Sequence, residues 1–309
     1  MPTLDEIIKQ KMARLQSVPD ALVSSADKAQ EAMLKKAQEL ISQMDIVDGK
    51  FEFTKKNIQL IEQIGNSLQG EIFSDQYVSD LTSYAKEFNS QATINNSYFS
   101  KLSNAFEPDS LYSAVVKQSQ KNALDLLGQD AVTAEIISPI KNSLLGAITN
   151  GGTFSETLAT ITEISTNTEA ADGILTRYVK RVAYDAFAVS DRQYTKAISE
   201  DLGLVFYKYQ GGETSDTRCF CEERKGGYYH KKEIQSWGRG QHIGSCAMKI
   251  KGAGNKTLWQ GANYATDENT IFSFVGGYSC KDSLLPYITT EVPDKWIQRA
   301  INLGFYSPN

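Results

Sequence analysis

Apolar and polar positions alternate with a helical period over roughly the first two thirds of the chain. Between residues 4 and 98 the apolar positions fall three or four residues apart, which predicts amphipathic helices. The predicted helices cover residues 4–15, 21–46, 51–68 and 75–98, and the turn dipeptide Asp48-Gly49 follows the second one. Their outer faces are rich in Gln, Asn and Ser, so we expect long antiparallel helical hairpins.

The apolar stripes of these long helices have two interpretations. They pack within one subunit, or they contact neighbouring copies of the chain, because long helices expose more surface than one small core can cover. The sequence leaves both interpretations open.

Further helices are predicted up to residue 201. They cover residues 110–127, 131–150, 155–164 and 174–201, with the Gly151-Gly152 turn between the second and the third. The last of these has one apolar stripe from Leu175 to Ile198 and places Arg192 on its outward or sideways surface. Gly203 is well placed to end this helix.

After Gly203 the pattern changes to short β-branched and aromatic runs bounded by glycine pairs. Strands are predicted at 204–209, 270–275 and 283–288, with helices near 232–237 and 294–303. The fold class is therefore α+β, with a mainly helical N-terminal region of long helices followed by a small α+β domain of few short strands. We expect three segments: a long-helix hairpin region at 1–105, a helical part at 106–203 and the small domain at 204–309.

Composition narrows the environment that we expect for the chain. It has 309 residues, a net charge of −5 and no apolar run of the roughly 18–20 residues that span a bilayer. The N-terminus has acidic residues and no apolar segment of a secretory signal, so we expect no membrane association and residence in a cytoplasm. In that compartment four cysteines are more often thiols or metal ligands than disulfides.

All four cysteines and both histidines lie between residues 207 and 286. The spacing of His242 and Cys246 suits two ligands of one ion, and Cys221 and Cys280 would complete a tetrahedral zinc site. Unligated thiols and a disulfide are the alternatives, because free cysteines are commonly small buried hydrophobes. Whichever applies, we expect Cys221 and Cys280 to lie close together. His230, between Tyr229 and Lys231, is expected at the surface.

Two glycine-rich motifs frame this region. The first runs from Gly211-Gly212 through Asp216 and Arg218 to Cys221, and the second joins Gly276-Gly277 and Cys280 to Pro286. Asp216 and Arg218 have the spacing of a turn brace, in which the arginine reaches the carboxylate. With the helix before them, the two motifs resemble the phage Mu F-like head morphogenesis, or minor head protein, family over residues 142–288.

The resemblance implies a virion structural protein without catalytic activity. It would act at or near the portal, in the head or neck and inside the capsid, during capsid assembly, DNA packaging or ejection. Before that it would reside in the host cytoplasm. The implied partners are the portal, other capsid proteins and further copies of the chain. Many relatives have Arg-His where this chain has Lys281-Asp282, and Cys219 stands where proline is common. The alternative is a metal-dependent nuclease or toxin-like enzyme built on the cysteines and histidines.

A local excess of positive charge lies in the same region. Residues 206–260 hold ten lysines and arginines against five acidic residues, although the whole chain is acidic. We expect the stretch from Arg224 to Lys256 to contact packaged DNA or an acidic portal surface without base specificity, whereas the alternative is a solvated face. Trp237 and Trp259 would either stack on single-stranded nucleic acid or supply a core for the small domain. The contact residues that we expect are Lys231, Lys232, Lys249 and Lys251.

Overall fold

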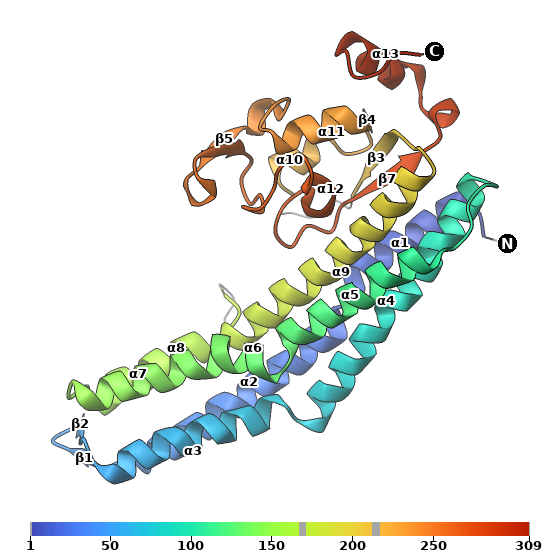
Figure 1. Ribbon diagram of the computed structural model, residues 1–309. Helices are drawn as coiled ribbons and strands as arrows, with labels where there is room; N and C mark the ends of the chain where they lie inside the picture. Colours follow the sequence, from blue (N-terminus) through green and yellow to red (C-terminus); the bar gives the residue numbers. More distant parts are fainter. Residues whose placement is uncertain (1, 167–170, 212–216, 309) are drawn as a thin grey trace. The chain divides into compact units, whose positions relative to one another are not determined.

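The structure is a computed structural model that describes residues 2–166, 171–211 and 217–308 (Figure 1). Long helices and a few short antiparallel strands make up this part of the chain, which confirms the predicted α+β class. The α-helices are α1 (Leu4–Ser17), α2 (Asp20–Ile41), α3 (Lys55–Ile72), α4 (Asp75–Leu102), α5 (Ser110–Leu127), α6 (Gln129–Val132), α7 (Ser138–Thr149), α8 (Phe154–Ser165), α9 (Ile174–Asp201), α10 (Cys219–Glu222), α11 (Lys231–Gly238), α12 (Ile271–Phe274) and α13 (Asp294–Asn302). The strands are β1 (Ile46–Val47), β2 (Lys50–Phe51), β3 (Phe206–Gln210), β4 (Tyr228–His230), β5 (Met248–Ile250), β6 (Lys256–Leu258) and β7 (Ser283–Tyr287).

The helix starts follow local capping chemistry. Thr3, Thr54 and Thr153 each accept a hydrogen bond from a backbone N–H in the first turn of α1, α3 and α8. Helix α2 ends at Ile41, earlier than the apolar pattern predicts, and Asp48-Gly49 instead turns a β-hairpin of β1 and β2. Both turn residues have positive φ, 49° and 78°, as a two-residue hairpin turn requires.

The chain divides into two compact units that are each discontinuous in sequence. Unit 1 comprises residues 1–18, 87–120 and 184–309, and unit 2 comprises residues 19–86 and 121–183. The division differs from the three consecutive segments expected from the sequence, because part of the N-terminal helical region belongs to the same unit as the small α+β domain.

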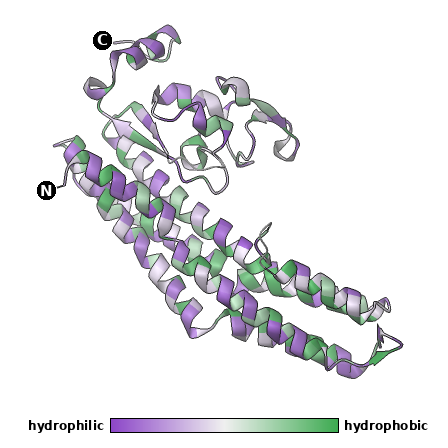
Figure 2. Cartoon of the chain, turned by 180° about the vertical axis from the view of Figure 1, so that it is seen from behind, coloured by the Kyte–Doolittle hydropathy of each residue, from purple (hydrophilic) through white to green (hydrophobic). Residues whose placement is uncertain are grey.

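Unit 2 is a helical bundle closed by the small hairpin. Helices α2, α3, α7 and α8 pack against one another, and β2 hydrogen-bonds to the α7–α8 connection at Gly152. Figure 2 shows hydrophobic and hydrophilic positions alternating along these helices, in agreement with the predicted amphipathic pattern. None of the described helices of the chain is long and apolar enough to cross a membrane.

Unit 1 contains a three-stranded antiparallel sheet in the order β4-β3-β7. Beside it lies a core of aromatic and aliphatic side chains in which Phe220 stacks on Trp259 at 3.8 Å and meets Trp237 edge-on. Both tryptophans are 0% exposed, so the interpretation that they stack on nucleic acid is wrong and the core interpretation is confirmed.

Two of the three strands predicted in the C-terminal region are confirmed as β3 and β7, whereas residues 270–275 form the short helix α12. The reason lies just before the apolar run. The Asp267 carboxylate accepts hydrogen bonds from the backbone N–H groups of Asn269 and Thr270, and this turn starts a helix. The hairpin of β5 and β6 was not predicted.

A buried polar network joins the helical part of unit 1. The Lys11 ammonium, on α1, lies 2.9 Å from the Asp191 carboxylate of α9 and donates to Asn95 of α4 and Thr195 of α9. Asp191 also accepts hydrogen bonds from the Gln91 and Asn95 amides. Burial is the main reason why the pKa of Lys11 is lowered. Three segments that are distant in sequence are therefore held together by one carboxylate.

Replacing Lys11 by Met should destabilise the protein strongly. The change leaves the Asp191 charge buried without its counter-ion, which typically costs about 3–5 kcal/mol. Urea unfolding should show this loss, and the double variant Lys11→Met/Asp191→Leu should recover part of it. Lys9→Met, at an exposed position of the same helix, is the matched control. Equal stability of Lys11→Met and Lys9→Met would contradict a structural role for the ion pair.

Candidate functional site

The two glycine-rich motifs meet at the N-terminus of α10. Arg218, directly before α10, donates through its guanidinium to the carbonyl oxygens of Gly276 and Tyr278 in the second motif. Trp259 donates to the same Gly276 carbonyl. The predicted partner Asp216 lies outside the described residues, so the turn brace stays a prediction. Among the described residues, the Arg218 side chain binds the second motif through its carbonyl oxygens.

A second arginine holds the same loop from the helical side. Arg192, on α9, is 4% exposed and donates to the carbonyl oxygens of Ser273, Cys280 and Asp282. The expectation that it faces outward or sideways is wrong. A guanidinium has five donors in a rigid fork, so one side chain can donate to several backbone carbonyls at once.

The glycines of the second motif are required by space and by backbone conformation. Gly276 and Gly277 have φ of 77° and 93°, a region that favours glycine. A Cβ at Gly277 would overlap the carbonyl oxygen of Gly261, and one at Gly276 would overlap the Cys280 sulfur. The motif glycines therefore allow the loop to lie directly against its neighbours. Pro286 lies in β7 and pairs with Tyr207, and its carbonyl accepts the Tyr98 hydroxyl.

Cys221 and Cys280 form a buried thiol pair, which confirms that the two motif cysteines lie together. Their sulfur atoms and a carboxylate oxygen of Asp282 all lie within 4.8 Å of one another. A hydrogen bond between the thiols raises the pKa of Cys221, with burial adding to the effect, and lowers the pKa of Cys280, where the Arg192 charge acts in the same direction. The surroundings therefore favour a negative charge on the Cys280 sulfur rather than on the Cys221 sulfur.

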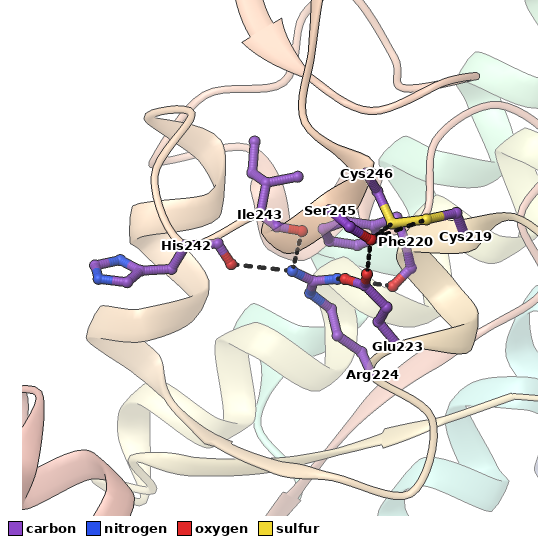
Figure 3. The surroundings of a disulfide bond; sticks show 8 residues. All are labelled: Cys219, Phe220, Glu223, Arg224, His242, Ile243, Ser245 and Cys246. Carbon is purple, nitrogen blue, oxygen red and sulfur yellow. Dashed lines mark hydrogen bonds and ion pairs between the residues drawn. A yellow bond between two sulfur atoms is a disulfide. The ribbon is translucent and has the colours of Figure 1, made fainter.

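Cys219 and Cys246 form a disulfide, with their Cα atoms 5.8 Å apart (Figure 3). It links α10 to the short 3₁₀ helix η2 (Gly244–Cys246), which precedes β5. Ser245 donates to the Glu223 carboxylate beside it. The cytoplasmic expectation of thiols or metal ligands is wrong for this pair.

The four predicted zinc ligands do not come together in the structure. Cys246 is bonded to Cys219, while Cys221 and Cys280 pair elsewhere with Asp282. His242 is exposed, its ring points away from the disulfide in Figure 3, and its Nδ1 lies 3.0 Å from the Ser236 hydroxyl. Sequence spacing alone missed Asp282, because its proximity depends on how β3 and β7 pair.

The basic stretch divides into buried and exposed side chains. Arg224 is 5% exposed, stacks on Phe220 and donates to the backbone carbonyls of His242 and Ile243, so it is part of the core. Lys231 is partly buried at the start of α11, and Lys232 is exposed beside it. Lys249 and Lys251 are exposed at and just after β5. Most of the predicted contact lysines are therefore accessible.

His230 is buried rather than at the surface. It is 5% exposed, contacts the rings of Phe206 and Tyr306, and its Nδ1 accepts a hydrogen bond from the Lys232 N–H at the start of α11. Burial, followed by the charges of Lys232 and Lys231, lowers the pKa of His230 to about 4. The folded protein therefore keeps this imidazole neutral at neutral pH.

No protein-family model matches the chain, and no curated protein or solved structure matches it either. The site is accordingly interpreted from its own geometry. Two arginines hold a glycine loop by its carbonyls, and Cys280 of this loop pairs with Cys221 of α10 next to the Asp282 carboxylate.

Stability should fall as the pH is lowered from about 6.5 to about 4. The unfolded chain protonates His230 below its ordinary pKa of 6.5, whereas the folded chain resists protonation until about pH 4. The loss is on the order of 2–3 kcal/mol. His230→Asn, whose side chain can still cap α11, should reduce this pH dependence in thermal unfolding measurements. Equal pH dependence in both proteins would contradict the assignment.

Proposed function

We propose that the chain is a virion structural protein of the phage minor head, or head morphogenesis, type that acts near the portal. One observation carries the proposal: the two motifs that carry the resemblance to the Mu F-like family form one structural element. Arg218 bridges them through backbone carbonyls, and Cys221 of the first motif contacts Cys280 of the second.

The described motif residues have structural roles, which supports an assembly protein over an enzyme. The Arg218 side chain is engaged with carbonyl oxygens, and the second-motif glycines provide close backbone approach. The nuclease or toxin-like alternative requires a general base beside a metal-bound water. His230 is a buried helix cap and His242 lies apart from the thiol pair and Asp282, so neither histidine favours that alternative.

Unit 2 provides the surface that we propose for contact with other subunits. Most of the exposed large apolar side chains among the described residues belong to it, and Val47 and Phe53 of the hairpin region are 55% and 63% exposed. The hairpin is held firmly, because Phe51 packs on Phe154 and its N–H donates to Gly152. An apolar patch on a held hairpin suits the portal, another capsid protein or a second copy of the chain.

The direct test compares particles assembled with and without this chain. Mass spectrometry should find the chain in purified wild-type particles, and particles lacking it should show defective assembly, DNA content or ejection. Nicking of plasmid DNA by the purified chain with added Mg²⁺ or Mn²⁺, together with its absence from particles, would instead support the nuclease alternative.

Replacing Val47 and Phe53 by Ser should block incorporation without unfolding the chain. Both side chains are largely exposed, so the free energy of unfolding should change by no more than about 0.5 kcal/mol per site. Incorporation is measured as the ratio of this chain to the major capsid protein in purified particles. Met248→Ser/Tyr264→Ser removes exposed apolar side chains from unit 1 and is the matched control. Normal incorporation of the Val47/Phe53 variant would overturn the proposed contact surface.

Replacing four lysines by Gln should weaken non-specific DNA binding. These side chains add positive charge near β5 and α11, and phosphate contacts release counterions, so affinity should fall by at least about tenfold at low salt and the salt dependence should become shallower. Fluorescence anisotropy with duplex DNA over a salt series measures both effects. The variant replaces Lys231, Lys232, Lys249 and Lys251.

The matched control makes the same change in charge at exposed lysines of unit 2. It replaces Lys28, Lys35, Lys55 and Lys86. If both quadruple variants bind DNA as the parent does at every salt concentration, the basic stretch is only a solvated face.

A further inference from the structure

We propose that Cys221, Cys280 and Asp282 form a zinc-binding site, distinct from the four-ligand set that sequence spacing suggests and independent of the proposed virion role. Two sulfur atoms and a carboxylate oxygen lie within 4.8 Å of one another. A tetrahedral zinc site has metal–ligand distances of about 2.0–2.3 Å, so three such atoms can surround one ion after small side-chain movements.

The backbone on both sides of the three ligand atoms is glycine. A Cβ at Gly276 would overlap the Cys280 sulfur and lie 3.3 Å from the Cys221 sulfur. A Cβ at Gly211 would overlap the Asp282 carboxylate. The first glycine of each motif therefore leaves the space that the ligand side chains occupy. Any other residue at either position would displace a ligand atom.

The backbone positions of the ligands are set by surrounding hydrogen bonds. Strands β3 and β7 pair Gln210 with Ser283, which brings the next residues, Gly211 and Asp282, to adjacent positions at the strand ends. Arg192 binds the carbonyls of Cys280 and Asp282, and Arg218 binds that of Gly276. The ligands are thus held before an ion binds, which lowers the entropic cost of binding.

The surroundings suit the charge of a bound zinc ion. Each thiol releases its proton on binding, so two thiolates and one carboxylate around Zn²⁺ carry a net charge of −1. The guanidinium of Arg192, bound to the carbonyl of Cys280, lies close enough to offset this charge. The fully buried Tyr209 hydroxyl, near Cys221, has no oxygen or nitrogen partner among the described residues and can donate to the thiolate.

The fourth position is open to a water molecule. Asp282 is only partly buried, so the site is reached from the carboxylate side, whereas both sulfurs are buried. Thiolates favour Zn²⁺ over Mg²⁺ or Ca²⁺, which prefer oxygen ligands. The Cys219–Cys246 pair, of which Cys219 is exposed and Cys246 partly buried, provides an internal control within the same domain.

The test measures zinc and cobalt binding by the full-length chain. Wild-type protein purified with a non-thiol reductant should hold about one zinc ion per chain, and Co²⁺ should give thiolate-to-metal charge-transfer absorption. Cys221→Ser and Cys280→Ser should lose both signals, and Asp282→Asn should weaken zinc affinity by at least about tenfold, or 1.4 kcal/mol. The control Cys219→Ser/Cys246→Ser should bind like the wild type.

A second measurement does not depend on the variants folding. In wild-type protein, zinc should slow alkylation of Cys221 and Cys280, identified by peptide mass spectrometry, with Cys219 and Cys246, freed by the non-thiol reductant, as the comparison. The proposal is wrong if the wild type binds no zinc, if alkylation of Cys221 and Cys280 is unaffected by zinc, or if only the Cys219/Cys246 variant loses the metal.

Discussion

The buried ion pair between Lys11 and Asp191 is the interaction on which unit 1 depends most. Removing two charges from water is costly, and the pair is tolerated because Asn95, Gln91 and Thr195 supply hydrogen bonds in fixed directions. A purely apolar core would be compatible with several packings of α1, α4 and α9. The directional hydrogen bonds of this network are satisfied in only one of them. The ion pair therefore specifies how the helices align, and their alignment positions the next residue of α9, Arg192.

Arg192 links the aligned helices to the glycine loop around residues 276–282. Neighbouring residues on a helix point in different directions, so Asp191 faces the helical network while Arg192 reaches the carbonyls of Cys280 and Asp282. Arg218, directly before α10, donates to two carbonyls of the same loop. The loop has little regular secondary structure, and the two guanidiniums donate to the backbone carbonyls of Cys280, Asp282 and Tyr278. The conformation around the thiol pair is thus set by groups outside the loop.

Helix locations and the fold class could be predicted from the sequence because the apolar period is a local property. The helix within residues 270–275 could not be predicted from the sequence. Its composition is typical of a strand, but the hydrogen-bonded turn at Asp267 starts a helix there instead. The cysteine pairing was also beyond sequence spacing: Cys219 and Cys221 are two residues apart on α10, yet one is exposed and bonded to Cys246 while the other is buried against Cys280. The roles of Arg192 and Asp282 arise only from tertiary contacts. The only sequence signal for the buried role of Arg192 was its position near the apolar stripe of the helix.

The discontinuous path of unit 1 has a consequence for its biosynthesis. Lys11 emerges from the ribosome long before Asp191, and Tyr98 long before its acceptor Pro286. Contacts of such high sequence separation form late, because loop closure must precede them. During most of translation, the apolar face of α1 and the Lys11 ammonium therefore lack their partners in the folded protein. Unit 2, completed by residue 183, can fold first and shorten the effective distance between the ends of unit 1.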